Sequence, residues 1–220
     1  MMDKIIAPSI LSADFAQLGK EVVDVINSGA DWIHFDVMDN HYVPNLTVGP
    51  MVCRSLREYG IKDFIDVHLM VEPVDQLVEM FAAAGADLIS FHPSATNNIS
   101  ETIKLIKKHG CKVGMAINPP ENSDIAKEYL NELDLVLLMS VNPGFGGQKF
   151  IEDVLEKIKD MRAYMDKNKS AARLEVDGGI NAKNIKDVSD AGADTFVLGS
   201  AIFNTDDYQN TIFTLRNNIS

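Results

Sequence analysis

A histidine and an aspartate lie two residues apart inside an apolar segment of the chain. The segment Trp32–Asp39 has the alternation of a β-strand, in which every second residue shares a face. His34, Asp36 and Met38 therefore point in one direction. An imidazole and a carboxylate inside an apolar strand are costly unless something binds them. For this strand alone, a hydrogen-bonded pair in the protein core explains the pattern as well as a ligand site does.

Two further segments of the same kind favour a site. The segment Asp66–Met70 places His68 on the same face as both of its ends. The segment Arg173–Gly179 places Asp177 on the same face as Glu175, and it ends in a pair of glycines. Three apolar strands that each carry charged or imidazole groups are harder to explain by core packing than one.

The side chains on these strands have the chemistry of a metal site. Two neutral imidazoles and two carboxylates suit a borderline divalent cation such as zinc, iron, cobalt or manganese. Magnesium and calcium fit less well, because they prefer shells made of oxygen atoms. The sequence therefore predicts one divalent transition-metal ion per chain, held by His34, Asp36, His68 and Asp177.

The fold that must position these donors is indicated by alternating patterns. Eight apolar segments begin near Ile5, Trp32, Phe64, Asp87, Cys111, Asp134, Arg173 and Thr195. Segments with the helical spacing of apolar residues lie between and after them: Phe15–Asn27, Val48–Tyr59, Val74–Ala84, Ile99–Lys108, Ser123–Asn131, Phe150–Lys167, Ala182–Ala191 and Tyr208–Asn217. Alternation throughout predicts a parallel sheet. Eight units in 220 residues fit an α/β fold, the closed (β/α)8 TIM barrel, better than an open doubly wound sheet.

A short sequence motif recurs at positions where a helix is expected to end and a strand to begin. Gly-Ala-Asp occurs at Gly29–Asp31, Gly85–Asp87 and Gly192–Asp194, and Leu133-Asp134 is a weaker copy. The glycine can end a helix, and the apolar strand follows. Because the chain has no linker and no break in composition, we expect residues 1–220 to form a single barrel domain.

Active sites of such barrels lie where the strands end, and three of the loops there are rich in glycine. Asn142–Gln148 follows the sixth strand, Gly178 and Gly179 follow the seventh, and Gly199 and Ser200 follow the eighth. Glycine-rich turns expose backbone N–H groups, and barrels often hold a phosphate near the seventh and eighth strands. The three loops together predict a phosphate site with few basic side chains.

Three methionines stand at the ends of predicted strands. Met38, Met70 and Met139 stand at the C-terminal ends of the second, third and sixth strands. Methionines of this kind are often barrel core. Their placement beside the predicted ligands suggests an apolar rim over the metal site.

The composition limits the partners and the compartment. A net charge of −12 argues against nucleic acid and anionic membranes as partners. No apolar run is long enough to span a bilayer, and the N-terminus runs directly into a predicted strand, so we expect no signal peptide. Cys53 and Cys111 have neither metal nor disulfide spacing and are predicted to be buried thiols in a cytoplasmic protein. We also expect a homo-oligomer.

Several motifs closely resemble those of the ribulose-phosphate 3-epimerase family, from one end of the chain to the other. They are Pro8–Asp14, Asp36–Asn45, Asp66–Met70, Asn142–Gln148 and Val176–Ile180. The resemblance implies a ribulose-phosphate-binding barrel and a metal-dependent isomerase of the pentose phosphate pathway. Its activity would be the interconversion of D-ribulose 5-phosphate and D-xylulose 5-phosphate.

The resemblance also implies roles for individual residues. Asp36 and Asp177 would be the acid–base pair as well as metal ligands, and Ser9, His68 and Asp177 would contact the sugar. The phosphate end would be lined by Gly144, Phe145, Gly146, Gly147, Gly178, Gly179, Gly199 and Ser200. Two departures from the family pattern are Ser94, where an acidic residue is expected, and Pro120-Glu121, where a small or hydroxyl-bearing turn is more typical.

The chemistry expected of an epimerase agrees with this pattern. Returning a proton to the opposite face of a carbon beside a ketone favours two carboxylates, and a divalent metal stabilises the enediolate. A decarboxylating barrel family would need a lysine where His68 stands. A Schiff-base aldolase would need one inside a strand, whereas Lys112 stands at the start of its segment. A non-catalytic phosphate-binding barrel would not need four metal donors. The nearest alternative is a 3-epimerase of a hexulose phosphate such as D-allulose 6-phosphate.

Overall fold

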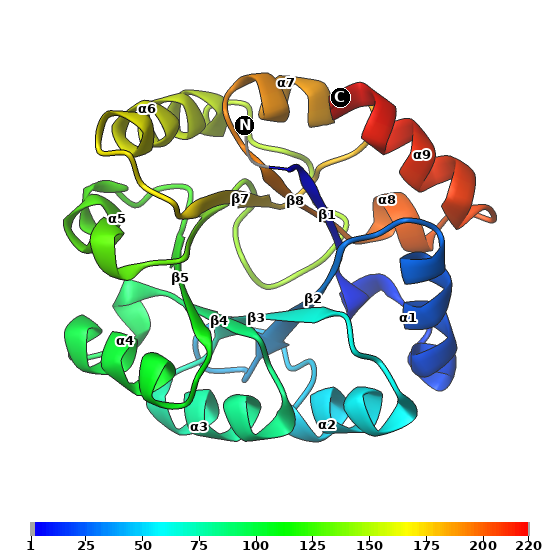
Figure 1. Ribbon diagram of the computed structural model, residues 1–220, viewed down its shortest axis with the longest axis horizontal. Coiled ribbons are helices and arrows are strands. Elements are labelled where there is room, and N and C mark those ends of the chain that lie inside the picture. Colours follow the sequence, from blue (N-terminus) through cyan, green and yellow to red (C-terminus); the bar gives the residue numbers. More distant parts are fainter. Residues whose placement is uncertain (1–2, 220) are drawn as a thin grey trace.

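The computed structural model describes residues 3–219, in which eight strands form one parallel sheet that curls into a barrel (Figure 1). This confirms the predicted fold class. The strands are β1 Ile5–Pro8, β2 Trp32–Met38, β3 Phe64–Met70, β4 Leu88–Phe91, β5 Lys112–Ile117, β6 Leu135–Met139, β7 Arg173–Asp177 and β8 Thr195–Leu198.

The barrel closes between its first two strands. The ladders run in the order β1-β8-β7-β6-β5-β4-β3-β2, and every pair in this order is parallel. A parallel bridge between Ser9 and His34 then joins the region after β1 to β2. A backbone hydrogen bond of 3.0 Å from Asp31 to the carbonyl of Ile6 adds to this seam. The end of β1 is therefore held beside the first half of β2, next to His34.

Helices form an outer ring around the strands (Figure 1). The predicted segments contain helices with later starts in most cases, because the first residues of several segments form turns or 3₁₀ helices. The helices are α1 Leu18–Asn27, α2 Pro50–Tyr59, α3 Asp75–Ala84, α4 Ile99–Lys108, α5 Asp124–Tyr129, α6 Val154–Lys167, α7 Ile185–Asp190, α8 Ser200–Phe203 and α9 Tyr208–Ile219.

Two of these helices differ most from the sequence-based expectation. The helix predicted from Phe150 begins at Val154, because the connection before it folds back and Ile151 donates a backbone hydrogen bond to Ser140. The helix α8 was not predicted at all. It is only four residues long, which is too short for apolar periodicity to reveal. No helix among the described residues is long and apolar enough to cross a membrane.

The alternation of side chains along the strands separates two cores. Ile33, Phe35 and Val37 of β2 point outward and pack in the main apolar core with residues of the surrounding helices. At the end of the barrel where the strands begin, the Trp32 and Phe64 rings stack with centroids 4.3 Å apart. The Arg173 guanidinium lies 5.4 Å from the Trp32 ring centroid. The inward-facing positions further along the strands carry the polar groups of the predicted site.

The recurring aspartates bind neighbouring strands to one another. Asp31, just before β2, accepts a hydrogen bond of 2.7 Å from the backbone N–H of Ile6 in β1. Asp87, just before β4, accepts one of 2.7 Å from Ile65 in β3. The same arrangement recurs in the next two strand pairs. The backbone N–H of Val113 in β5 donates to Asp134, just before β6, and that of Leu174 in β7 donates to Asp194, just before β8.

Three of these carboxylates also pair with an arginine from a helix. Arg57 of α2 lies 2.5 Å from Asp87, and it donates to the carbonyl of Gly85. Gly85 has a φ of 103°, and a Cβ there would stand 2.9 Å from Cγ of Arg57. The recurring glycine is therefore needed for backbone conformation and for the close approach of the arginine. Arg162 of α6 and Arg216 of α9 pair in the same way with Asp194 and Asp31, at 2.6 and 2.7 Å.

Candidate metal and active site

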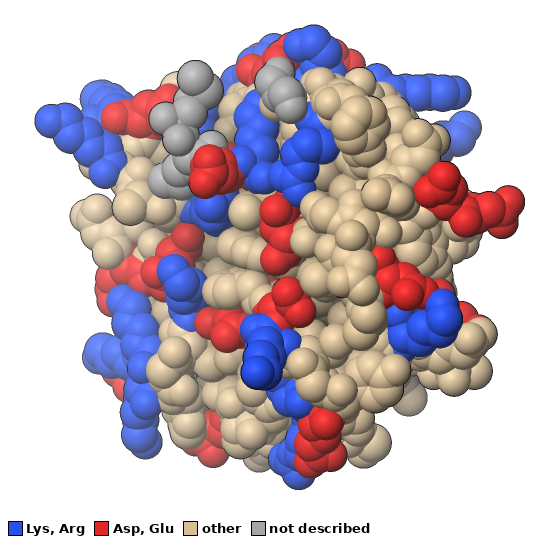
Figure 2. Space-filling model, turned by 45° about the vertical axis from the view of Figure 1, so that its right-hand side comes forward, with Lys and Arg blue, Asp and Glu red and all other residues tan. Residues whose placement is uncertain are grey.

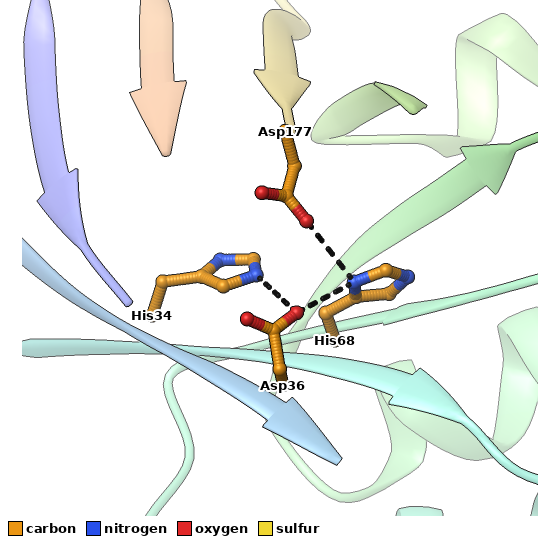
Figure 3. A group of neighbouring side chains, drawn as sticks. All are labelled: His34, Asp36, His68 and Asp177. Atoms are coloured by element: carbon orange, nitrogen blue, oxygen red, sulfur yellow. Dashed lines mark ion pairs between the residues drawn. The ribbon is translucent and has the colours of Figure 1, made fainter. Parts of the chain in front are cut away.

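The four predicted metal donors meet inside the barrel, near the ends of three strands (Figure 3). His34 and Asp36 come from β2, His68 from β3 and Asp177 from the last position of β7. In the β2–β3 ladder, Asp36 is the direct partner of His68, so the register alone brings these two side chains together. One potential ligand atom from each of the four residues lies within 4.8 Å of the others.

The spacing of these atoms suits a bound cation. Asp36 Oδ1 lies 3.4 Å from His34 Nε2 and 3.5 Å from His68 Nδ1, and Asp177 Oδ2 lies 3.9 Å from His68 Nδ1. His34 Nε2 and His68 Nδ1 are buried and have no hydrogen-bond partner. Buried polar atoms are seldom left without a partner. The two unpartnered nitrogens, aimed at two carboxylates, fit a divalent transition metal.

The two carboxylates have opposite protonation tendencies. Burial alone would raise the pKa of Asp36, but the charges and hydrogen bonds of His34 and His68 hold it well below its usual range. Burial, and next to it the charge of Asp36, raise the pKa of Asp177 to about 8. Near neutral pH the pair therefore contains one carboxylate and one carboxylic acid, which is a common arrangement in acid–base sites.

Three more buried polar residues stand directly behind the histidines, and sequence analysis gave them no role. Asp66 Oδ2 lies 2.6 Å from His34 Nδ1, and His92 Nε2 lies 2.9 Å from His68 Nε2. Glu175 is fully buried beside Asp66, and burial together with the charge of Asp66 raises its pKa well above the ordinary value. Strand alternation placed Asp66 and Glu175 on the interior face, but it did not indicate which side chains they would touch.

An open pocket leads to Asp36 and Asp177 from the end of the barrel where the strands finish. It encloses about 580 Å³, part of which is open to solvent. Ser9 lines it and donates a 2.5 Å hydrogen bond to Asp36 Oδ2. His68, which was expected to contact the sugar, is fully buried and is not among the lining residues. Its ring reaches the site only through the atoms that face Asp36 and Asp177.

The glycine-rich loops form one wall of the same pocket. All eight residues predicted for the phosphate end line it, namely Gly144, Phe145, Gly146, Gly147, Gly178, Gly179, Gly199 and Ser200. Gly179 has a φ of 68°, and a Cβ there would lie 2.4 Å from the backbone nitrogen of Phe150. This glycine lets the loop after β7 pass directly under the loop after β6.

Two residues of the loop after β2 connect parts of the pocket by hydrogen bonds, although sequence analysis assigned them no role. Asn45 donates a 2.7 Å hydrogen bond to the carbonyl of Gly144. Thr47 donates to the carbonyl of Asp36 at 2.6 Å and accepts from the Met38 backbone at 2.9 Å. The loop therefore ties the β6 loop to the strand that carries two of the metal donors.

The three methionines occupy the positions suggested by the sequence. Met38, Met70 and Met139 all line the pocket, and each is almost completely buried. Met38 and Met70 pack with Val43 in a small apolar cluster at the end of β2 and β3. An apolar border of this kind lowers the local dielectric around charges in the site.

The two departures from the family pattern contact one another outside the pocket. Ser94 Oγ lies 3.4 Å from Glu121 Oε1 and 3.0 Å from Tyr42 Oη. Asn118 Nδ2 donates to both Tyr42 and Glu121, at 2.9 and 3.1 Å. These residues do not line the pocket, and Tyr42 connects them to the site, because its ring lies 4.9 Å from that of His92.

The fold is shared with solved structures of low sequence identity. A structure of KGPDC from Streptococcus mutans matches with a TM-score of 0.74 at 17% identity, covering 100% of this chain and 98% of that chain. The 3-hexulose-6-phosphate synthase from Salmonella typhimurium matches with a TM-score of 0.71 at 18% identity, covering 98% of each chain. At these identities the comparison establishes the barrel and nothing more.

Sequence comparison identifies the family. A chain named ribulose-phosphate 3-epimerase from Escherichia coli K12 is 53% identical over 220 residues, covering 100% of this chain and 98% of the relative. One of the same name from Serratia marcescens is 56% identical over 205 residues, covering 93% of this chain and 98% of the relative. The model of the ribulose-phosphate 3 epimerase family matches residues 5–203. Together with the barrel and its buried His/Asp cluster, these matches place the chain in the ribulose-phosphate 3-epimerase family of isomerases.

Proposed function

We propose that the chain interconverts D-ribulose 5-phosphate and D-xylulose 5-phosphate through an enediolate, with Asp36 and Asp177 as the two proton-transferring groups. The observation that carries this proposal is the pairing of two carboxyl groups at one pocket with opposite pKa shifts. Epimerisation removes a proton from C3 and returns one to the opposite face. One ionised carboxylate and one protonated carboxyl group supply both functions in a single encounter.

The two groups come from different sides of the barrel, since Asp36 lies on β2 and Asp177 on β7. A flat substrate held between them presents one face to each. Asp36, kept ionised by its histidine neighbours, accepts the C3 proton, and Asp177 delivers its own proton to the other face. After the two transfers Asp36 carries a proton and Asp177 is ionised, and proton exchange with solvent restores the starting state before the next turnover. The opposite epimer reacts with these roles exchanged.

His34, Asp36 and His68 would hold a divalent cation, and Asp177 would be its fourth donor whenever it is ionised; zinc, iron, cobalt and manganese are the candidates. Bound there, such a cation would stabilise the negative charge that develops on the substrate oxygens. Ser9 keeps Asp36 oriented by its 2.5 Å hydrogen bond. The methionine border, Met38, Met70 and Met139, would exclude water from the intermediate.

The glycine-lined wall suits the phosphate of such a substrate. Its lining residues are mostly glycines with accessible backbone, and Ser200 adds a hydroxyl group. Neutral donors of this kind bind a phosphate dianion without a dedicated basic side chain. On the face shown in Figure 2, basic and acidic side chains are interspersed over a mainly uncharged surface, as expected for a protein with a small-molecule partner.

The experiment that tests the substrate is a side-by-side assay of D-ribulose 5-phosphate and D-allulose 6-phosphate with the same metal-loaded protein. We expect kcat/KM for the pentulose to be at least about tenfold higher, because a hexulose must fit an extra carbon between the metal donors and the glycine wall. A higher kcat/KM for allulose 6-phosphate would overturn the pentulose assignment in favour of the hexulose alternative.

A homo-oligomer in the cytoplasm completes the proposal. Phe15, Met51 and Tyr59 are exposed and line one surface depression between α1 and α2, where self-association would cover them. Both cysteines, Cys53 and Cys111, are free and buried, which agrees with a reducing compartment. Light scattering of the purified protein tests the assembly, and a monomer at micromolar concentration would contradict it.

A further inference from the structure

The two histidines of the metal site present different ring nitrogens to it. His34 offers Nε2, and His68 offers Nδ1. In each ring the remaining nitrogen has a partner on the far side, which is Asp66 for His34 and His92 for His68. A neutral imidazole has one N–H donor and one acceptor, so a partner that accepts on one nitrogen leaves the other free to bind a cation.

The partner of His34 is an anionic acceptor fixed by strand register. Asp66 lies directly opposite His34 in the β2–β3 ladder, and its Oδ2 is 2.6 Å from His34 Nδ1. Both side chains are completely buried. A carboxylate cannot donate in this contact, so the proton lies on Nδ1 of His34 and the lone pair lies on Nε2.

The partner of His68 is another histidine. His92 follows β4, and its Nε2 lies 2.9 Å from Nε2 of His68. Two imidazole nitrogens at this distance share one proton, so one ring donates and the other accepts. If His68 uses Nδ1 for the metal, its Nε2 carries the proton and His92 must accept. The His92 ring is buried and is held in place against Tyr42, with centroids 4.9 Å apart.

We propose that Asp66 and His92 are positioning residues that set opposite tautomers in His34 and His68, and that the anionic backing makes His34 the more tightly held ligand. This inference rests on the metal site proposed above. A carboxylate behind an imidazole increases the electron density at the ligating nitrogen more than a neutral ring does, and loss of such a partner commonly weakens metal binding by roughly 10- to 100-fold. The two backing residues therefore stabilise the same site unequally.

Variants of His92 separate hydrogen bonding from packing. His92→Phe keeps a ring against Tyr42 but removes the acceptor, whereas His92→Gln keeps an acceptor oxygen. We expect His92→Phe to raise the dissociation constant for zinc roughly tenfold and His92→Gln to stay within about threefold of wild type. The measurement is competition with a chromogenic chelator. His109→Gln is the matched control, because His109 lies at the end of α4, away from the site.

Variants of Asp66 test the ranking of the two ligands. Asp66→Asn keeps an acceptor oxygen without its charge, and Asp66→Leu removes both. We expect Asp66→Leu to weaken zinc binding roughly 100-fold, more than His92→Phe does, and Asp66→Asn to lie between wild type and Asp66→Leu. Where Asp66→Leu fails to fold, comparison of Asp66→Asn with His92→Gln decides the ranking: a larger loss of zinc affinity in Asp66→Asn supports it, and a loss no larger than in His92→Gln overturns it.

A spectroscopic measurement reports the tautomers directly. In zinc-loaded protein with ¹⁵N-labelled histidine, long-range proton–nitrogen correlation should show the N–H on Nδ1 of His34 and on Nε2 of His68. The same tautomer in both rings would overturn the proposal. So would unchanged zinc affinity in folded His92→Phe. Failure of the wild-type protein to bind zinc, cobalt or manganese would instead overturn the metal site itself, which keeps the two failures distinguishable.

Discussion

At the end of the barrel where the strands begin, four aspartates each accept a hydrogen bond from the backbone of a neighbouring strand. At the end where the strands finish, buried His34 Nε2 and His68 Nδ1 have no hydrogen-bond partner. Both ends hold charged groups inside an apolar framework. At the first end the aspartate carboxylates are hydrogen-bonded within the protein. At the second end the two imidazole nitrogens point toward the space between Asp36 and Asp177. The paired aspartates indicate stability, whereas the two unpaired imidazole nitrogens, which face two carboxylates, indicate a ligand.

The largest expected difference between the two ends is the loss of kcat on substitution. Asp36→Asn and Asp177→Asn should each lower kcat by roughly 10²- to 10⁴-fold, because each removes a proton-transferring carboxyl group but keeps the side-chain shape. In deuterated water the two variants should exchange the C3 proton of opposite epimers, since each retains one functional face. Metal content must be measured in parallel. Equal exchange of both epimers by both metal-replete variants would point to a single mobile base.

A substitution at the opposite end should affect stability and leave the chemistry intact. Asp194→Ala removes the partner of Arg162 at 2.6 Å and of the Leu174 backbone, which should lower the free energy of unfolding by about 3 kcal/mol. Thermal denaturation and kcat of the folded fraction provide the measurement. Asp190→Ala, which breaks only an exposed pair with Lys186, is the control and should leave the Tm unchanged. A large loss of kcat in Asp194→Ala without a lower Tm would contradict the division of roles between the two ends.

A smaller effect is expected at the glycine wall. Gly146→Val should raise KM roughly 10-fold and leave the metal in place, since the side chain would stand between the backbone and the phosphate. A Cβ at Gly146 would have only ordinary contacts with Leu11 and Ser12, at 3.8 and 3.9 Å, so the variant should fold. Inorganic phosphate should inhibit the wild type competitively. An unchanged KM would move the phosphate to another part of the pocket.

The smallest effect is a dependence of metal affinity on pH. Burial and the charge of Asp36 raise the pKa of Asp177 to about 8, so below that pH a cation gains Asp177 as its fourth donor only by displacing a proton. Although burial alone would lower the pKa of His34, Asp66 and Asp36 raise it, which acts in the same direction. Affinity should therefore increase with pH and level off above about pH 8 for Asp177, by no more than about tenfold per pH unit for each proton released. Chelator competition from pH 6.5 to 8.5 measures this, and an affinity that falls with pH would contradict it.

Sequence periodicity was sufficient to predict the barrel and the four residues that meet in its interior. It worked because strand alternation and parallel order together determine which side chains share a face and which strand ends meet. The contacts of Asp66 with His34 and of His92 with His68 depend on register between strands, which no local pattern specifies. The pairing of Arg57 with Asp87 was missed for the same reason, since 30 residues separate them along the chain.

Each aspartate hydrogen-bonds to the strand before its own, so the barrel consists of four similar two-strand quarters. These quarters determine where the chain can be opened in a circular permutant. Arg216 donates to the carbonyl of Lys4 at 2.8 Å, so the two ends of the described chain lie close together. A circular permutant that joins the ends and opens between β4 and α4, at 96–98, would keep each of the three arginine-paired aspartates on the same stretch of chain as its arginine. Opening within α3 would instead separate Arg57 from Asp87. The first permutant should fold as a modular ring of unbroken quarters, and the second should not.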